Sequence, residues 1–170
     1  MKNLWKRYGI FTLLTALAVL LDQWTKKLAF DQLRVNGPVV IIKGVFELLY
    51  SENRGAAFGI LQGKKLFFFF VAFAVLLIIL YFLAKLPCKK RYLPLFACMV
   101  LLAAGAVGNL IDRAVRGFVV DFFYFKLIDF PIFNVADCYV VAAAVLLILL
   151  TAFFYKDEEL SFLYGKESEQ

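Results

Sequence analysis

Four long apolar stretches constrain this chain more than any other feature of its sequence. They lie at about residues 8–30, 66–84, 92–111 and 135–155. Each is long enough to cross a bilayer, since a spanning helix needs about 20 residues at a rise of about 1.5 Å per residue. The 170-residue chain is 64% hydrophobic, above the roughly 45–50% of soluble domains. The sequence therefore predicts a membrane protein with an all-α core of four transmembrane helices.

The distribution of basic residues predicts the orientation of these helices. Three basic residues occur among the first seven, and the link at residues 85–91 contains three lysines and one arginine. Because cytoplasmic loops are enriched in Lys and Arg, we expect both termini and this link to be cytoplasmic. Residues 31–65 and 114–134 would then lie outside. Topology and contact with anionic membrane lipids explain the net charge of +6, so nucleic acid is not an expected partner.

The first external segment has the composition of a small β structure. Residues 39–50 (VVIIKGVFELLY) are rich in β-branched and aromatic residues around a Lys-Gly turn signal. We expect a hairpin or β-cradle within about residues 36–63, on the extracytoplasmic surface of the membrane. The chain has no internal repeat, so residues 1–155 are predicted to form one domain, followed by a polar cytoplasmic tail at residues 156–170.

Acidic residues at the ends of the apolar stretches suggest where chemistry could occur. The aspartates concerned are Asp22, Asp112, Asp121, Asp129 and Asp137. A charge in hydrocarbon costs at least roughly 2.5–3.5 kcal/mol, so such acids indicate function by default. The chain has no histidine to activate a serine or cysteine, and three scattered cysteines do not make a metal site. Paired carboxylates remain, of which one can activate water while the other polarises a carbonyl.

Two of the polar clusters also have a purely structural interpretation. Asp22 and Lys26 are four residues apart and share a helix face. They could support a site, form an ion pair that extends to the membrane interface, or do both. Asn134 and Asp137 begin the fourth apolar stretch at the N-cap and N3 positions. Helix capping alone could explain them.

The remaining clusters are harder to explain without a functional site. Asn109, Asp112, Arg113 and Arg116 form one stripe at the end of the third stretch. The alternative is a stop-transfer flank, but such a flank does not need an amide in register with an acid. Asp121 interrupts an apolar, aromatic run where it has no local structural role. All clusters fall at the predicted outer face, whereas a proton-conducting path would place acids near the midplane.

Five motifs, taken in order, resemble the lipoprotein signal peptidase (signal peptidase II) family. They are DQWTK at residues 22–26, NRGAAF at 53–58, GNLIDR at 108–113, VVDF at 119–122 and FNVAD at 133–137. The resemblance implies a multi-pass aspartic endopeptidase of the bacterial inner membrane. Such an enzyme cleaves diacylglyceryl-modified prolipoproteins on the amino side of the lipidated cysteine. It requires neither a metal ion nor an organic cofactor.

The resemblance also implies roles for individual residues. The catalytic pair falls on Asp121 and Asp137, near the extracytoplasmic face. The supporting and substrate-binding residues would be Asp22, Lys26, Asn53, Gly55, Asn109, Asp112, Arg113 and Asn134. Cyclic lipopeptides that mimic the substrate would bind the same site, and we expect the enzyme to act as a monomer.

Three other interpretations are compatible with parts of the pattern. Asp112 could replace Asp121 as the partner of Asp137. A small proton-coupled transporter would need acids distributed through the membrane depth. A non-catalytic assembly scaffold would use the polar stripes only to join helices, and neutral replacements of Asp121 and Asp137 would then preserve its function.

Overall fold

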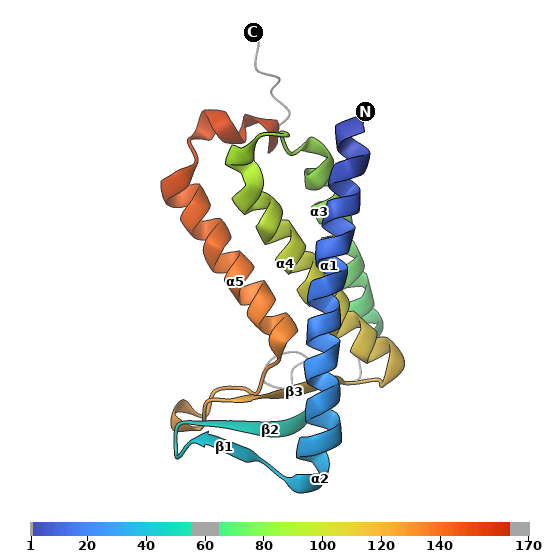
Figure 1. Cartoon of the computed structure of the whole chain (residues 1–170), viewed down its shortest axis with the longest axis vertical. Coiled ribbons are helices and arrows are strands. Elements are labelled where there is room, and N and C mark those ends of the chain that lie inside the picture. Colours follow the sequence, from blue (N-terminus) through green and yellow to red (C-terminus); the bar gives the residue numbers. More distant parts are fainter. Residues whose placement is uncertain (1, 56–64, 164–170) are drawn as a thin grey trace.

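The computed structural model describes residues 2–55 and 65–163. Its four long helices form a bundle, and three strands form a sheet at one end of that bundle (Figure 1). The four helices are α1 (Lys2–Leu28), α3 (Lys65–Lys85), α4 (Leu93–Val115) and α5 (Val135–Leu149). All four belong to helical stretches long and apolar enough to span a membrane, which confirms the prediction of a four-helix membrane core. Which end faces the cytoplasm stays a prediction.

Helix α4 is the central element of the bundle, because α1, α3 and α5 all pack against it. Small residues make the close approach to α5 possible. A Cβ atom at Gly105 would lie only 2.5 Å from Cγ2 of Val140 and 2.7 Å from the carbonyl oxygen of Ala136. Helices that meet in a membrane commonly use such small residues, because packing replaces the hydrophobic effect there. The first turn of α5 is thereby pressed against α4.

The first helix continues beyond α1 towards the sheet. It passes through the π-helical turn η1 (Ala29–Leu33) and the short helix α2 (Arg34–Asn36). It ends at Gly37, whose φ of 83° lies in a region that favours glycine. The amide of Gly37 donates to the carbonyl of Leu33 over 3.1 Å and closes the last turn. This glycine redirects the chain into the first strand.

The sheet is antiparallel, in the order β1-β2-β3. Strands β1 (Val39–Ile42) and β2 (Phe46–Asn53) form the predicted hairpin around Gly44, whose φ is 74°. The third strand, β3 (Val119–Tyr124), comes from the second external segment and pairs with β2. The sequence did not predict this third strand. Residues 56–63 of the predicted external segment fall in the part of the chain that is not described.

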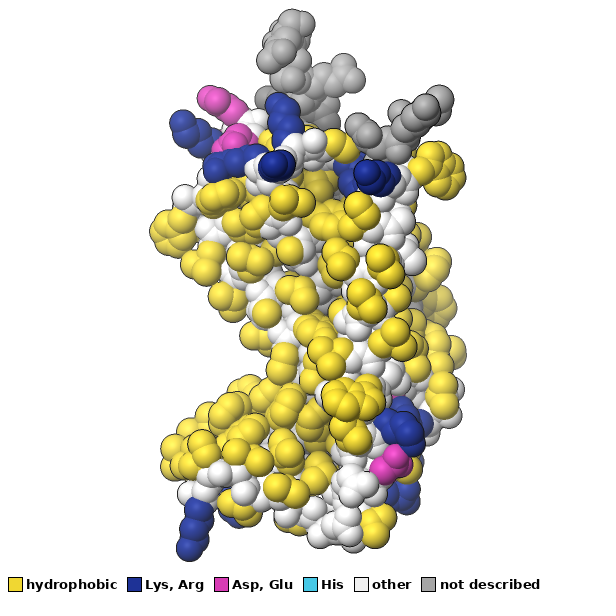
Figure 2. Space-filling model, viewed as in Figure 1, with side chains coloured by type: hydrophobic (Ala, Val, Ile, Leu, Met, Phe, Trp, Pro, Cys, Tyr) yellow, Lys and Arg dark blue, Asp and Glu magenta, His cyan; other side chains and the backbone are white. Residues whose placement is uncertain are grey.

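The sheet projects from the bundle as a platform. Its inner residues Val120 and Phe122 pack against Ala29 and Leu33 at the end of the first helix. Apolar side chains cover both the helices and the platform, and the surface is hollowed between them (Figure 2). The end of α4, strand β3 and the start of α5 meet where the platform joins the bundle (Figure 1).

The chain after α5 continues to pack against the bundle. Helix α5 is extended by the π-helical turn η5 (Leu150–Phe154), and the 3-10 helix η6 (Asp157–Leu163) follows. Leu160 of η6 is buried in one cluster with Leu86 and Tyr92. The division at residue 155 stays a prediction, but the first part of the predicted tail contacts the core.

Candidate active site

Asp121 is held in the middle of strand β3, facing strand β2. Ser51 lies directly opposite it, and Asn53 lies on the same face two residues further along β2, opposite Val119. Such diagonal neighbours in a sheet are within reach of longer side chains. Nδ2 of Asn53 donates to Oδ2 of Asp121 over 3.0 Å. The side chain of Asp121 is only 2% exposed, so the sheet both buries and orients this acid.

Asp137 occupies the first turn of α5, as predicted from the capping pattern. The amide of Asp137 donates to Oδ1 of Asn134, and the amide of Asn134 donates to Oδ2 of Asp137, both over 3.1 Å. This capping box begins the helix. It uses only one oxygen of Asp137. The other oxygen, Oδ1, accepts from Nδ2 of Asn109 on α4 over 2.8 Å.

Asn134 connects the two aspartates. Its Nδ2 donates to Oδ1 of Asp121 over 2.6 Å, and its Oδ1 accepts from the amide of Asp137. The orientation of the carboxamide is fixed because a backbone N–H can only donate. The oxygen must therefore face Asp137, and the NH2 group must face Asp121. Asn134 therefore caps the helix, and the same fully buried side chain also donates a hydrogen bond to Asp121.

Lys26 fixes the orientation of Asn109 in the same way. Its ammonium group donates to Oδ1 of Asn109 over 2.8 Å. An ammonium group has no acceptor, so the NH2 group of Asn109 is directed at Asp137. Nδ2 of Asn134 also lies 3.2 Å from Oδ1 of Asn109. Lys26, the two asparagines and the two aspartates thus form one continuous hydrogen-bonded chain.

Lys26 belongs to a balanced set of four charges, of which three are completely buried and Arg116 is partly exposed. Its Nζ lies 2.9 Å from Oδ2 of Asp22 and 3.3 Å from Oδ2 of Asp112, and all three side chains are completely buried. Arg116 pairs with the other oxygen of Asp112. Two acids therefore face two bases, as buried charges require. The alternative of an ion pair extending to the interface is wrong, because Lys26 turns inward and reaches no solvent.

The two acids of this cluster also position the backbone beside the candidate catalytic pair. Oδ1 of Asp22 accepts from the amide of Ala136 over 2.9 Å. Oδ2 of Asp112 accepts from the amide of Val120 over 3.1 Å. These amides belong to the residues immediately before Asp137 and Asp121, respectively. The buried charge cluster therefore fixes both the strand and the helix that contain the pair.

Arg113 ties the end of strand β2 to α4. Its Nη2 donates to the carbonyl of Gly55 over 2.9 Å, and its guanidinium lies 4.4 Å from the ring centre of Phe68 on α3. The amide of Gly55 in turn donates to Oδ1 of Asn53 over 3.0 Å. This contact orients the Asn53 carboxamide so that its NH2 group faces Asp121. Residues 56–58 of the same predicted motif lie outside the described residues.

The environment of Asp121 shifts its protonation equilibrium. Burial raises the pKa of Asp121 to about 7, and the nearby charge of Asp137 adds to this effect. The hydrogen bonds from Asn53 and Asn134 act in the opposite direction. Asp137 is only half-buried. The two carboxyl groups therefore differ in environment, which is the condition for dividing acid and base roles between them.

All ten residues predicted for the site meet at this end of the bundle, but one of the five noted aspartates does not. Asp129 lies on the loop after β3, with a φ of 47°, and accepts from the hydroxyl of Tyr124 over 2.7 Å. Conversely, Gln23 contributes although it was quoted only within a motif. Its Nε2 donates to the carbonyl of Gly108 over 3.0 Å and to Oδ2 of Asp22 over 3.2 Å.

Gly108 is a further residue of the site, quoted above only within the motif at residues 108–113. A Cβ atom there would lie 2.5 Å from Oδ2 of Asp22 and 3.3 Å from the Cβ of Ala136. The absent side chain lets α1, α4 and α5 converge. A run of small residues signals close packing in general, but it does not reveal that the neighbour is a buried carboxylate.

The fold and the site together define a class of protein. Four membrane spans enclose, at one end, two carboxyl groups joined by hydrogen-bonded amides, with one of them buried. Two carboxyl groups in unlike environments are the arrangement that an aspartic peptidase within a membrane protein would need.

Comparisons with known proteins identify the family. Residues 14–154 match the family model described as signal peptidase (SPase) II. The lipoprotein signal peptidase of Caldanaerobacter subterraneus is 45% identical over 141 residues, covering 82% of this chain and 94% of the relative. That of Clostridioides difficile is 40% identical over 147 residues, covering 85% and 96%. The chain belongs to the signal peptidase II family.

A solved structure shows the same fold. It is a bacterial membrane enzyme determined by the in meso method at 2.3 Å resolution, with a TM-score of 0.74 and 31% identity. The match covers 95% of this chain and 94% of that one. The resemblance seen in the five motifs is thus confirmed. With it, the assignment as a multi-pass bacterial membrane enzyme and aspartic lipoprotein signal peptidase is confirmed.

Proposed function

We propose that Asp121 and Asp137 are the catalytic pair of this peptidase. The observation that supports the assignment is the bridge through Asn134, which donates to Asp121 and accepts from the amide of Asp137. Asp112, the other candidate partner, is engaged by Lys26, Arg116 and the amide of Val120. An acid that already holds these three groups has little capacity left to exchange a proton with water.

The reaction divides the two carboxyl groups by protonation state. Asp137 acts as the carboxylate base at the start of α5, where the backbone N–H groups of a helix N-terminus stabilise negative charge. It takes a proton from a water molecule, and the resulting hydroxide attacks the scissile carbonyl carbon. Protonated Asp121 donates a hydrogen bond to the carbonyl oxygen as negative charge develops there. The proton held by Asp137 then passes to the leaving amine, the C–N bond breaks, the carbonyl re-forms, and Asp121 keeps its own proton throughout.

The buried cluster around Lys26 supports this reaction by preorganisation. Catalytic groups accelerate a reaction most when the surrounding structure holds them in place before the substrate arrives. Asp22 and Asp112 hold the backbone on the amino side of each catalytic residue. Lys26, through Asn109, holds one oxygen of Asp137. We assign these residues to positioning rather than to bond making.

The substrate is a prolipoprotein whose cysteine carries a diacylglyceryl group, and the bond cleaved lies on the amino side of that cysteine. Its acyl chains would enter sideways from the lipid, over the apolar surface between the bundle and the projecting sheet (Figure 2). The basic link between α3 and α4 and the start of α1 lie at the other end of the bundle (Figure 1). By the positive-inside rule the site therefore faces the extracytoplasmic side of the inner membrane.

The other predicted properties follow from the same site. Neither a metal ion nor an organic cofactor enters the proposed reaction. Cyclic lipopeptides that imitate the acylated substrate would compete for the hollow beside the sheet. We expect a monomer to suffice, because in the described part of the chain both carboxyl groups already find hydrogen-bonding partners.

Cleavage of a matched pair of substrates tests the proposed function. The purified enzyme is incubated with a prolipoprotein that carries the diacylglyceryl group and with the same prolipoprotein without it. Mass spectrometry of the products then identifies the bond that was cleaved. We expect a single cut before the cysteine in the lipidated substrate only. Equal cleavage of both substrates, or a cut at another bond, would contradict the proposal.

A further inference from the structure

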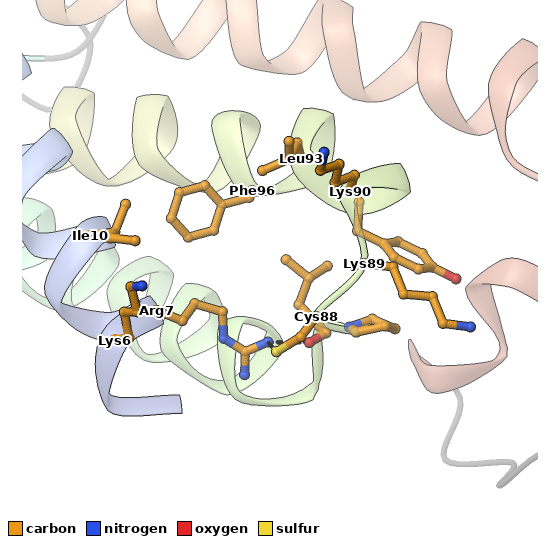
Figure 3. Close-up of a pocket in the computed structure, with 11 residues that line it drawn as sticks. Lys6, Arg7, Ile10, Cys88, Lys89, Lys90, Leu93 and Phe96 are labelled. Carbon is orange, nitrogen blue, oxygen red and sulfur yellow. Dashed lines mark hydrogen bonds between the residues drawn. The ribbon is translucent and has the colours of Figure 1, made fainter. Parts of the chain in front are cut away.

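A second cavity lies at the end of the bundle opposite to the site. It has a volume of about 340 Å³, within the roughly 300–1,000 Å³ range of ligand pockets. The start of α1 forms one wall, and the link after α3 and the start of α4 form the other (Figure 3). The residues that matter for its chemistry are Lys6, Arg7, Ile10, Lys89, Lys90 and Phe96.

The charge of this cavity is uniformly positive. Four of its lining residues are basic, and none of the lining residues in the described part of the chain is acidic. Lys6, Lys89 and Lys90 are exposed, and no carboxylate of the described residues lies within 4.0 Å of their ammonium groups. By contrast Arg91, at the same end, pairs with Glu159 over 3.0 Å. The cavity thus concentrates positive charge, and no carboxylate in the described part of the chain pairs with its three lysines.

Arg7 forms the fixed part of the wall. Its guanidinium donates to the carbonyl of Leu86, to that of Ala84 over 3.0 Å and to Sγ of Cys88 over 3.6 Å. These bonds hold α1 against the link, and Figure 3 shows the arginine reaching across to Cys88. The Nε atom of Arg7 is buried and has no acceptor among the described residues. Arg7 therefore joins α1 to the end of α3 and to the link that follows it, at the base of the cavity.

The cavity also has apolar walls that continue into the membrane spans. Ile10 on α1 and Leu93 and Phe96 on α4 line it on the side of the spans (Figure 3). Trp5, which directly precedes the lining residue Lys6 on α1, is 79% exposed. An exposed tryptophan at the end of a transmembrane helix is typical of the headgroup level of a bilayer. Basic groups therefore lie at headgroup level, directly beside apolar groups at acyl-chain level.

We propose that this cavity binds one anionic phospholipid. Its phosphate would lie among Lys6, Lys89 and Lys90, and the first methylene groups of its acyl chains would lie against Ile10 and Phe96. Basic pockets between transmembrane helices recognise anionic headgroups through this combination of charge and apolar contact. The site is separate from the peptidase site, and the inference does not depend on which residues catalyse cleavage.

Native mass spectrometry of the full-length enzyme tests this inference. The enzyme is released from nanodiscs that contain equal amounts of phosphatidylglycerol and phosphatidylcholine with identical acyl chains. The test variant is Lys89→Gln/Lys90→Gln. The matched control is Lys85→Gln/Lys156→Gln, which removes the same charge from the same end of the bundle, at positions that do not line the cavity. Arg7 stays unchanged because it joins two helices.

We expect the wild type and the control to retain one phosphatidylglycerol in preference to phosphatidylcholine. Each cavity lysine contributes roughly fivefold to the affinity for an anionic headgroup, so the test variant should bind about thirtyfold more weakly. Equal retention by the test variant and the control would overturn the inference. Displacement of the lipid by millimolar inorganic phosphate would also overturn it, because the ligand would then be a free phosphate.

Discussion

Replacing Asn134 by serine separates its two roles. Serine is about as good an N-cap as asparagine, so the Ser variant keeps an acceptor for the amide of Asp137. Its side chain is shorter and carries no NH2 group. The donor that lies 2.6 Å from Oδ1 of Asp121 is therefore lost. In Asn134→Ala, the helix cap and the donor are lost together.

The size of the effect follows from these contacts. Leaving a buried acceptor without its donor costs about 1–3 kcal/mol, which corresponds to a decrease in kcat/KM of roughly 5- to 150-fold. Loss of the cap costs about 1 kcal/mol more in stability. We therefore expect Asn134→Ser and Asn134→Ala to lose similar activity, while only the Ala variant loses the additional stability.

The pH profile gives a readout that capping alone would not change. The hydrogen bond from Asn134 lowers the pKa of Asp121, so its removal should raise that pKa. The alkaline decline in kcat/KM should shift to higher pH in both variants. The assays are cleavage of a lipidated prolipoprotein between about pH 5 and pH 9, and thermal unfolding in detergent. Wild-type activity and an unchanged pH profile in Asn134→Ser would refute the bridging role.

Three further predictions follow from the described contacts. The reaction needs protonated Asp121, whose pKa is about 7, so the wild-type kcat/KM should be highest below this pH and fall about tenfold per pH unit above it. A flat profile from pH 6 to 9 would contradict the acid role. Gly108→Ala places a Cβ 2.5 Å from a buried carboxylate oxygen on α1, so the free energy of unfolding should fall by about 1–3 kcal/mol. Gly9→Ala has open space around the new Cβ, so thermal unfolding should show no destabilisation. Lys26→Met leaves two buried carboxylates without their common base and should lower the free energy of unfolding by about 3–5 kcal/mol. Lys27→Met removes an exposed partner of one ion pair and should lower it by at most about 1 kcal/mol. Equal unfolding temperatures for the two lysine variants would contradict the buried network.

Local sequence patterns predicted the helices, the hairpin and the cap. The apolar stretches specify spanning helices through length and composition alone, and Gly44 marks the turn between two β-rich segments. Asn134 and Asp137 are three residues apart, which is the spacing of a capping box. In each case the interacting residues are close in sequence, so spacing is enough to find them.

Features that depend on distant residues could not be predicted in the same way. Strand β3 pairs with β2, and the hydrogen bond from Asn53 to Asp121 joins residues 68 positions apart. An aromatic run with one acid gives no indication of such a partner. The spacing of Asp22 and Lys26 shows a shared helix face, but not that the face turns inward.

Without the motif resemblance, residue type and local spacing could not separate the aspartates that share a site from the one that does not. Asp121 and Asp129 are both acids among aromatic residues of the second external segment. Asp121 lies in a strand that α4 holds through the amide of Val120, whereas Asp129 lies in the following loop and binds Tyr124. The difference arises from the tertiary structure.

The most direct test of the catalytic pair compares four isosteric variants on one substrate. Asp121→Asn, Asp137→Asn and Asp112→Asn are assayed for cleavage of a diacylglyceryl-modified prolipoprotein after each has been shown to fold. Asp129→Asn is the control, because it removes an acid from the same external segment outside the site. We expect cleavage to be abolished in the first two variants, reduced in Asp112→Asn and unchanged in the control. Near-normal cleavage by Asp121→Asn together with none by Asp112→Asn would contradict the account and assign the pair to Asp112 and Asp137.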